Sequence, residues 1–259
     1  PKMKKYLFLM LLICGLTHAQ NQIEDNPQEL QTKIKELDEI IKTEPTAENF
    51  YFRGFFKYKM GNFHGALPDY DMAIKINPED FDSYYSRGML KDKINDYKGA
   101  VEDYTVCVLL DPHSAKALFN RGFSKSKIKD FLGASDDYSK CIDVNPDHFA
   151  AYLNRGIIRQ NQKSYAEAIS DFDKAEEIKP RFIDAIQNRA ICKAMLGRKD
   201  AIDDFNKAVS LDGQNPETYY NRALYLINYN MNGNYCNDLK IAERLGFGRA
   251  KKLIAEKCR

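Results

Sequence analysis

The chain has 259 residues, with 39 Lys and Arg against 37 Asp and Glu, and it contains 16 Tyr and 15 Phe but no Trp. Residues 1–19 hold three of the lysines, so the remaining chain has 36 basic and 37 acidic residues and a net charge near −1. This balance gives no indication of a basic nucleic-acid surface or of a polybasic membrane patch.

Residues 1–19 have the pattern of a secretory signal peptide. Two lysines precede an apolar stretch at 6–13, and Thr-His-Ala then forms a small-residue cleavage site. The apolar stretch is shorter than the about 20 residues that a transmembrane helix needs. The alternatives are an uncleaved anchor and lipidation of Cys14, although Ile13 stands where lipoprotein signals have a small residue. The polar residues 20–27 are predicted to be a flexible start of the mature chain.

Residues 28–46 form a predicted capping segment. Its helix is expected over 28–43, because apolar residues at helical spacing give this stretch one apolar face. The residues of that face are Leu30, Ile34, Leu37, Ile40 and Ile41. A lone helix ahead of a repeated pattern is typical of the terminal cap that a solenoid needs for solubility.

Six copies of one pattern fill residues 47–246. The copies span 47–80, 81–114, 115–148, 149–182, 183–215 and 216–246, and the first four are 34 residues long. The fifth is one residue shorter, in its internal turn at 197–200. A fixed period of this length indicates a repeat architecture, in which each unit buries its apolar face only against its neighbours.

Each copy is predicted to form two helices that approach each other closely. Small residues mark the first helix at Gly54, Gly88, Gly122, Gly156, Ala190 and Ala223, and the second helix at Ala66, Ala100, Ala134, Ala168 and Ala201. An aromatic residue follows on the second helix and is expected to fill the space between repeats; these are Tyr70, Tyr104, Tyr138, Phe172 and Phe205. Proline then stops the helix, at Pro78, Pro112, Pro146 and Pro180.

This combination of aromatic, Gly, Ala and Pro positions resembles the tetratricopeptide repeat family. The resemblance covers residues 47–246, about three-quarters of the chain. It implies an all-α fold: a right-handed helical solenoid of about six helix-turn-helix repeats, with capping helices at both ends. The chain departs from the commonest family pattern by having Arg, instead of Leu, directly before the small residue of the first helix.

Two charged columns recur at fixed positions of the copies. The basic column is Arg53, Arg87, Arg121, Arg155, Arg189 and Arg222, and the acidic column is Asp69, Asp103, Asp137, Asp171, Asp204 and Asp238. Because every Arg has a matching Asp, we predict a structural ladder of ion pairs within or between repeats. The alternative is that the arginines line a surface for an anionic ligand.

The family resemblance implies that the first helix of each repeat lines a concave face. Side chains one helical turn apart on these helices are predicted to form an apolar groove for a partner peptide. The groove residues are Tyr51, Phe55, Tyr58, Tyr85, Met89, Phe119, Phe123, Leu153 and Ile157. The alternative is that each of them packs between adjacent first helices. A nearby column, Asn120, Asn154, Asn188 and Asn221, could hydrogen-bond a peptide backbone or local helix groups.

Residues 247–259 are predicted to form a C-terminal capping helix over 249–257. Cys258 at its end and Cys236 at the start of the preceding helix would meet in an antiparallel hairpin. Since an exported chain enters an oxidising compartment, we predict a disulfide between them, with two unpaired thiols as the alternative. Cysteines inside the repeats are expected to be packed and unreactive: Cys107, Cys141 and Cys192.

No recognisable catalytic or cofactor motif accompanies the repeats. A Ser-x-x-Lys at 124–127 has no companion motif, and residues 246–248 lack the third Gly of a dinucleotide loop. The histidines His64, His113 and His148 are far apart. We therefore expect no enzyme activity, no cofactor and no metal site. Some relatives bind the acidic tail of a chaperone with a clamp that includes Lys and Asn. Tyr51 and Phe55 stand at those positions here, so we do not expect this chain to bind such a tail.

Together these patterns predict an exported, non-enzymatic scaffold or adaptor of a bacterial cell envelope, which binds a peptide segment of another protein. The periplasm is the expected location, with secretion and membrane tethering as alternatives. No nucleic-acid partner and no stable membrane insertion after signal cleavage are expected. Other functions considered are a self-assembling structural module, and an accessory binding subunit of a cell-wall or polysaccharide system.

Overall fold

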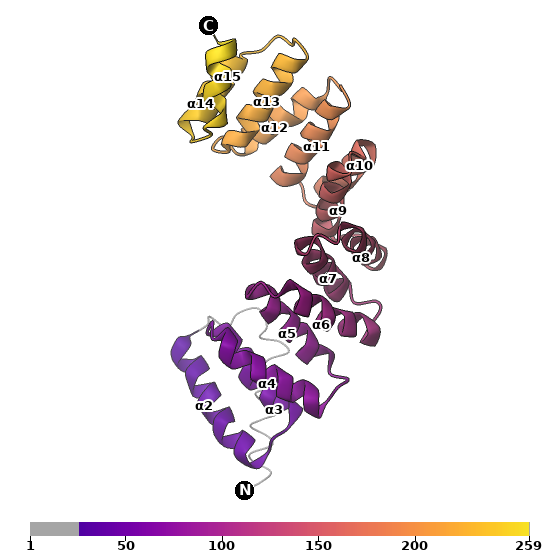
Figure 1. Cartoon of the computed structure of the whole chain (residues 1–259), viewed down its shortest axis with the longest axis vertical. Helices are drawn as coiled ribbons and strands as arrows, with labels where there is room; N and C mark the ends of the chain where they lie inside the picture. The colour runs from indigo at the N-terminus through magenta and orange to yellow at the C-terminus, as the bar shows by residue number, and fades with distance from the viewer. Residues whose placement is uncertain (1–25, 259) are drawn as a thin grey trace. The chain divides into compact units, whose positions relative to one another are not determined.

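The computed structural model describes residues 26–258. The expected signal peptide over 1–19 and most of the expected flexible segment over 20–27 lie outside the described residues. Within 26–258 every regular element is a helix, from α2 to α15 (Figure 1). The prediction of an all-α repeat fold is confirmed. No helix in the described part of the chain is long and apolar enough to cross a membrane.

After the single helix α2, the described helices follow in six pairs, from α3 and α4 to α13 and α14, and the single helix α15 ends the series. Their bounds are α2 (Pro27–Thr43), α3 (Ala47–Lys59), α4 (Phe63–Ile76), α5 (Phe81–Lys93), α6 (Tyr97–Leu110), α7 (Ala115–Lys127), α8 (Phe131–Val144), α9 (Phe149–Asn161), α10 (Tyr165–Ile178), α11 (Ile183–Met195), α12 (Ala201–Leu211), α13 (Pro216–Asn228), α14 (Tyr235–Arg244) and α15 (Arg249–Lys257). The first helix of each pair begins at the first residue of a sequence copy.

The chain divides into two compact units, one up to Asp111 and one from Pro112. The first unit contains α2 to α6, and the second contains α7 to α15. Within each unit, consecutive helices pack against one another. A second helix therefore contacts both the first helix of its own repeat and the first helix of the next repeat in that unit.

Side chains at the helix starts explain the regular helix bounds. Asp80 accepts a hydrogen bond from the backbone N–H of Ser83, and Asp130 accepts one from Gly133. Such caps satisfy N–H groups that have no partner inside the helix. Asn26 caps α2 in the same way and Pro27 occupies its first turn, so this helix begins one residue before the expected start at 28.

The turn inside each repeat has one residue with left-handed backbone. These residues are Gly61, Asn95, Lys129, Lys163, Gly197 and Asn230, with φ between 48° and 74°. Glycine adopts this conformation without strain, whereas lysine does not. The shorter turn of the fifth repeat is followed by the 11-residue α12, compared with 14 residues in α10.

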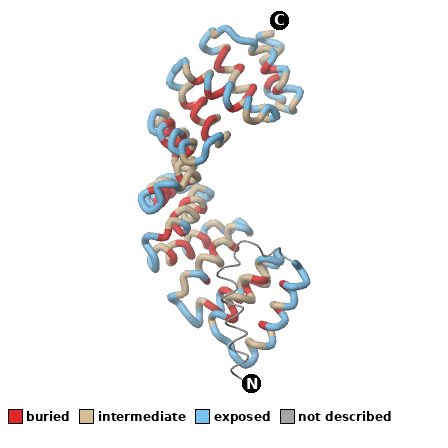
Figure 2. The backbone as a smooth tube through the Cα atoms, turned by 180° about the vertical axis from the view of Figure 1, so that it is seen from behind, coloured by how far each residue is buried: buried red, intermediate tan, exposed pale blue. Residues whose placement is uncertain are grey.

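The core of each of the first four repeats is a ring packed on a glycine. A Cβ atom on Gly88 would lie 2.8 Å from Cε1 of Tyr104, and one on Gly156 would lie 2.6 Å from Cε1 of Phe172. The aromatic column therefore fills the space between the two helices of one repeat, rather than only the space between repeats as expected from the sequence. Figure 2 shows the resulting rows of buried residues along the inner sides of the helices.

Both ends of the described chain are covered by a helix. On α2, the buried residues Leu30, Ile34 and Leu37 pack with Phe56. On α15, Ala250 is fully buried and packs with Leu239 and Ala242 of α14.

Candidate functional site

One aspartate is buried on the second helix of every repeat, with 0–5% of its surface exposed. In the third repeat, Arg121 donates from Nε to Asp137 Oδ2 at 2.9 Å and from Nη2 to Oδ1 at 2.6 Å. The planar guanidinium matches the two carboxylate oxygens of a single aspartate. The same pairing joins Arg53 to Asp69, Arg87 to Asp103, Arg155 to Asp171, Arg189 to Asp204 and Arg222 to Asp238.

A second cation reaches the same aspartate in five of the repeats. It lies one helical turn after the Arg, and its distance to the carboxylate is 2.7–3.0 Å. These cations are Lys57, Lys91, Lys125, Arg159 and Lys193. The sixth repeat has Leu226 at this position. The sequence contains this column, but its role was missed because lysines near the end of a helix usually face water.

In five of the described repeats, the remaining nitrogen of the arginine, Nη1, contacts a helix that precedes the repeat in the chain. Arg87 Nη1 lies 2.6 Å from Asp71, and Arg155 Nη1 donates to Ser139 Oγ at 3.1 Å. Equivalent contacts join Arg53 to Asp38, Arg189 to Asp173 and Arg222 to Asn206. The guanidinium groups therefore bind groups of this chain on both sides, which does not favour the alternative of a surface for an anionic ligand.

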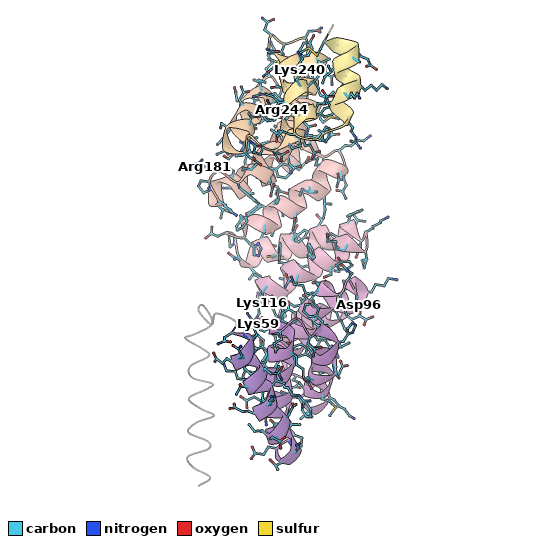
Figure 3. The ribbon with its side chains drawn as sticks, turned by 90° about the vertical axis from the view of Figure 1, so that its left-hand side faces the viewer. Lys59, Asp96, Lys116, Arg181, Lys240 and Arg244 are labelled. Carbon is cyan, nitrogen blue, oxygen red and sulfur yellow. A yellow bond between two sulfur atoms is a disulfide. The ribbon has the colours of Figure 1, made fainter. Side chains whose placement is uncertain are left out.

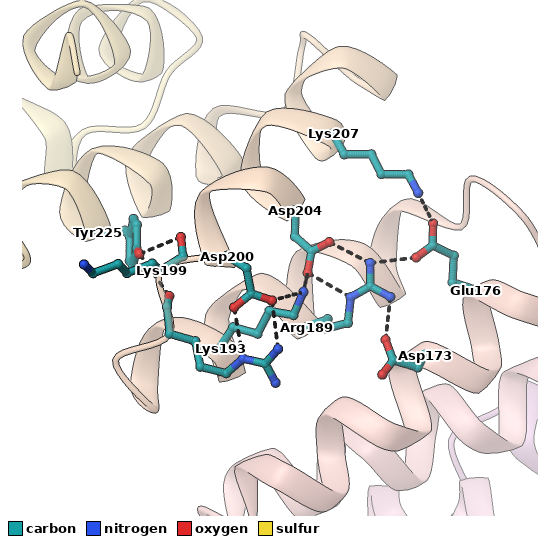
Figure 4. Close-up of polar contacts among 10 residues, drawn as sticks. Asp173, Glu176, Arg189, Lys193, Lys199, Asp200, Asp204, Lys207 and Tyr225 are labelled. Carbon is teal, nitrogen blue, oxygen red and sulfur yellow. Dashed lines mark hydrogen bonds and ion pairs between the residues drawn. The ribbon is translucent and has the colours of Figure 1, made fainter. Parts of the chain in front are cut away.

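The fifth repeat has the densest of these networks (Figure 4). Arg189 contacts Asp173, Glu176 and Asp204, while Lys193 also contacts Asp204. Burial acts to raise the pKa of Asp204, but hydrogen bonds from Arg189 and Lys193 outweigh it and hold this pKa below its ordinary value. Asp204 is thus held as a charged, structural group.

First-helix residues of the first unit are half-buried, and Tyr51, Phe55 and Tyr58 also pack against the core. Tyr51, Phe55 and Tyr58 on α3, and Tyr85 and Met89 on α5, all keep part of their surface exposed. The Tyr51 and Phe55 rings are stacked with centroids 6.5 Å apart. Burial raises the pKa of Tyr51 and Tyr58, so both phenols stay neutral near physiological pH. This face is therefore apolar.

The second unit has a similar face on α7 and α9. Phe119 and Phe123 on α7, and Leu153 and Ile157 on α9, are half-buried. The Lys127 ammonium lies 4.9 Å from the Phe123 ring centre. A cation–π contact of this kind covers one face of the ring, so Phe123 offers only part of its surface to another molecule.

Hydroxyl groups of the buried tyrosines are satisfied by side chains of the first helices. Tyr104 donates to Asp92 Oδ2 at 3.0 Å, and the Tyr138 hydroxyl is hydrogen-bonded to Ser126 and Asn154. The fourth repeat differs, because Phe172 has no hydroxyl. There Gln160 Oε1, at the position equivalent to Asp92, is a buried oxygen without a hydrogen-bond partner among the described residues.

Replacing Phe172 with Tyr is expected to raise the free energy of unfolding by about 0.5–1.5 kcal/mol, since the new hydroxyl would reach the buried Gln160 oxygen. Chemical denaturation followed by circular dichroism measures the change. Phe205→Tyr is the matched control, because Ala194 stands at the acceptor position of that repeat. Equal destabilisation by the two substitutions would show that the fourth repeat has no room for the hydroxyl.

His148 links the second-unit face to a helix start. Its Nδ1 accepts a hydrogen bond from the Ala151 N–H at 3.1 Å, which caps α9, and its ring centre lies 4.5 Å from that of Phe119. Burial lowers the pKa of His148, because the charged imidazolium is poorly solvated there. The cap therefore depends on the neutral form.

We expect stability to fall as the pH drops from about 6.5, the ordinary pKa of His, through the lower pKa of folded His148. The unfolded chain takes up the proton more readily in this range, and the lost cap should cost on the order of 1 kcal/mol. Unfolding midpoints between neutral and mildly acidic pH measure the effect. His148→Asn, which caps without titrating, should flatten the profile; an unchanged profile would assign the pH dependence to other groups.

The Asn column is only partly available for a ligand. Asn154 is engaged with Tyr138, and Asn188 Nδ2 donates to the Asp184 carbonyl of its own helix at 2.8 Å. The amide oxygen of Asn188 keeps its capacity to accept a further hydrogen bond.

Cys236 and Cys258 are joined by a disulfide with an S–S distance of 2.10 Å and a Cα–Cα distance of 5.6 Å. It connects the start of α14 to the end of α15. Cys107, Cys141 and Cys192 are buried thiols that take no part in this disulfide. Burial raises the pKa of Cys141 to about 11 and that of Cys192 to about 12, so neither forms a reactive thiolate near neutral pH.

The geometry of these repeats agrees with comparisons to known proteins. Family models described as tetratricopeptide repeat match residues 81–114 and 128–181. The chain is a tetratricopeptide repeat protein. No curated protein matches it. Among the described residues, no group of His, Cys, Asp and Glu side chains is arranged to hold a metal ion.

Solved structures show the same tetratricopeptide repeat fold. A MamA protein is 26% identical with a TM-score of 0.62, over 65% of this chain and 92% of that one. YrrB, described as a TPR protein with an unusual peptide-binding site, is 19% identical with a TM-score of 0.64, over 73% of this chain and 97% of that one. Pseudomonas aeruginosa pilF is 18% identical with a TM-score of 0.67, over 82% of this chain and 97% of that one.

Proposed function

We propose that this tetratricopeptide repeat protein is a non-catalytic scaffold that binds peptide segments of another protein on its first-helix faces. The observation that carries the proposal is the contrast between two sets of side chains. The charged columns are satisfied within the chain, whereas the aromatic and aliphatic side chains on the first helices pack only partly against the core and keep some of their surface exposed. Contact with another molecule would bury this remaining apolar surface, which is favourable.

The two units supply separate candidate faces. In the first unit, the proposed anchors are Phe55 and Tyr85, which an extended or helical peptide would contact with apolar side chains. In the second unit, the proposed anchors are Phe119, Phe123 and Ile157. The Asn188 amide oxygen would accept a hydrogen bond from the peptide backbone. The peptide-binding site ascribed to YrrB supports this use of the fold.

We place the protein outside the reducing cytosol, in the cell envelope. The leader pattern of residues 1–19 supports export, and the Cys236–Cys258 disulfide supports an oxidising compartment. The periplasm is the proposed location.

Peptide-display selection on the immobilised chain tests the binding proposal. Selected peptides should bind the native protein, and Phe55→Ala or Phe123→Ala should weaken binding by about 1–3 kcal/mol for peptides that use that unit. Phe131→Ala is the control, because Phe131 is an exposed Phe on a second helix.

Three outcomes would contradict the proposal. If all three variants bind alike, the first-helix faces are not the site. If Phe55→Ala or Phe123→Ala loses helicity, that residue belongs to the packing of its unit. If no peptide is selected and the mass in sedimentation rises with concentration, self-assembly replaces peptide binding as the function.

A further inference from the structure

Basic residues concentrate at the C-terminal end of the chain, although the overall charge is balanced. Residues 240–258 contain six Lys or Arg and two Glu. Residues 26–111 contain 11 basic and 16 acidic residues, and residues 112–239 contain 18 basic and 17 acidic residues. Residues 240–258 are therefore a strongly cationic part of a chain that is elsewhere neutral or acidic.

Five exposed cations are distributed over α14 and α15, which pack against each other. Lys240 and Arg244 are one turn apart on α14 (Figure 3). Arg249, Lys251 and Lys252 belong to α15, and all five residues are exposed. We call these five residues the basic cap face.

Few carboxylates neutralise the basic cap face. Lys252 lies 4.0 Å from Glu256, and both side chains are more than half exposed. Within the described part of the chain, no ion pair is recorded for Lys240, Arg244, Arg249 or Lys251. An exposed pair at 4.0 Å contributes little, so the positive charge is available to another molecule.

The hairpin presents these charges from a fixed support. Its inner side packs Ala250, Leu253 and Ile254 against residues of α13 and α14. The disulfide between Cys236 and Cys258 closes its open end. Much of the apolar side of α15 is thus covered, so an interaction of the exposed cations with a partner would be mainly electrostatic.

We propose that the basic cap face docks on an anionic phospholipid surface. The face has five cations spread over two helices and no exposed aromatic anchor among them, so it lacks the features that give a protein partner specificity. Mobile phosphate headgroups need no shaped pocket, and each Lys or Arg close to an anionic membrane contributes about fivefold in affinity. The acidic first unit would not be attracted to the same surface. This inference is independent of the proposed peptide binding.

Vesicle co-sedimentation of the full chain tests the proposal. Binding to vesicles of phosphatidylcholine mixed with phosphatidylglycerol should exceed binding to phosphatidylcholine alone, and it should fall as salt is added. Binding to vesicles of pure phosphatidylcholine measures the background that the apolar residues 6–13 contribute. The test variant reverses four charges of the face: Lys240→Glu, Arg244→Glu, Lys251→Glu and Lys252→Glu. We expect its salt-sensitive binding to fall at least tenfold.

A control variant makes the same change in net charge on exposed lysines of other repeats: Lys75→Glu, Lys98→Glu, Lys129→Glu and Lys163→Glu. It should retain most of the binding, and circular dichroism should show both variants folded. Equal losses of vesicle binding in the two variants would show that net charge alone explains the effect, which would overturn the proposal. It would also fail if soluble polyglutamate bound the cap face while phosphatidylglycerol vesicles did not, because the partner would then be an acidic protein.

Discussion

Replacing Asp137 with Ala is expected to lower the free energy of unfolding by about 3–5 kcal/mol, the usual cost of removing one partner from a buried ion pair. Asp137 is fully buried and receives hydrogen bonds from Arg121 at 2.6 and 2.9 Å, and Lys125 lies 2.8 Å away. Without the carboxylate, two cations remain in a poorly solvated position with no counter-charge. The loss of stability therefore reflects the cost of the unpaired buried cations more than the net contribution of the ion pair to stability.

Asp136 provides the matched control on the same helix. It is exposed and pairs with Lys140 at 2.7 Å, so Asp136→Ala should cost no more than about 0.5 kcal/mol. Urea unfolding of both variants measures the difference. If Asp137→Ala does not fold, Asp137→Asn keeps an acceptor and gives a smaller loss in the same direction. Equal midpoints for Asp136→Ala and Asp137→Ala would show that the ion-pair column does not stabilise the fold.

Removing the disulfide has the second largest expected effect. Cys236 and Cys258 are 22 residues apart, and a loop of this size corresponds to about 3 kcal/mol in the chain-entropy account. Cys236→Ser combined with Cys258→Ser should destabilise the last helix pair by up to this amount. Hydrogen exchange should show faster exchange in α14 and α15, with the first unit unchanged.

A thiol count on the chain starting at Gln20 is the companion measurement. Three reactive thiols after denaturation without reductant would match the buried residues Cys107, Cys141 and Cys192. Five thiols would show that the bridge is not formed. Cys107→Ala serves as a control. Reductant should destabilise this variant as much as it destabilises the unsubstituted chain, because Cys107 lies far along the chain from α14 and α15.

The repeat fold could be predicted because its constraints are local. Gly88 has no room for a side chain beside Tyr104, and Pro112 cannot continue a helix, so these residues recur at fixed spacing and mark the repeats directly. The bounds of the last helix, Arg249 to Lys257, were predictable for the same reason, since Gly246 interrupts the preceding helix with φ of 95°.

The contacts of the charged columns were harder to predict. The pairing of Arg with Asp followed from their matched spacing, but the contact of Arg189 with Asp173 depends on how one helix pair stacks on the next. Likewise, the unsatisfied oxygen of Gln160 results from a Phe in place of a Tyr twelve residues later, and only the packed structure relates these two positions. The role of His148 as a helix cap was missed because His is an uncommon capping residue.

The burial of three thiols has a consequence for how the chain oxidises. Among the five cysteines of the described chain, random oxidation of an unfolded polypeptide could form ten different pairs. Once the helices of the second and third repeats have formed, Cys107 and Cys141 are inaccessible to an oxidant, and Cys192 follows with the fifth repeat. After folding, only Cys236 and Cys258 among these five cysteines remain accessible to an oxidant. Burial of the other thiols before oxidation therefore determines which disulfide forms. Refolding under oxidising conditions should need no disulfide isomerase to reach the native pairing.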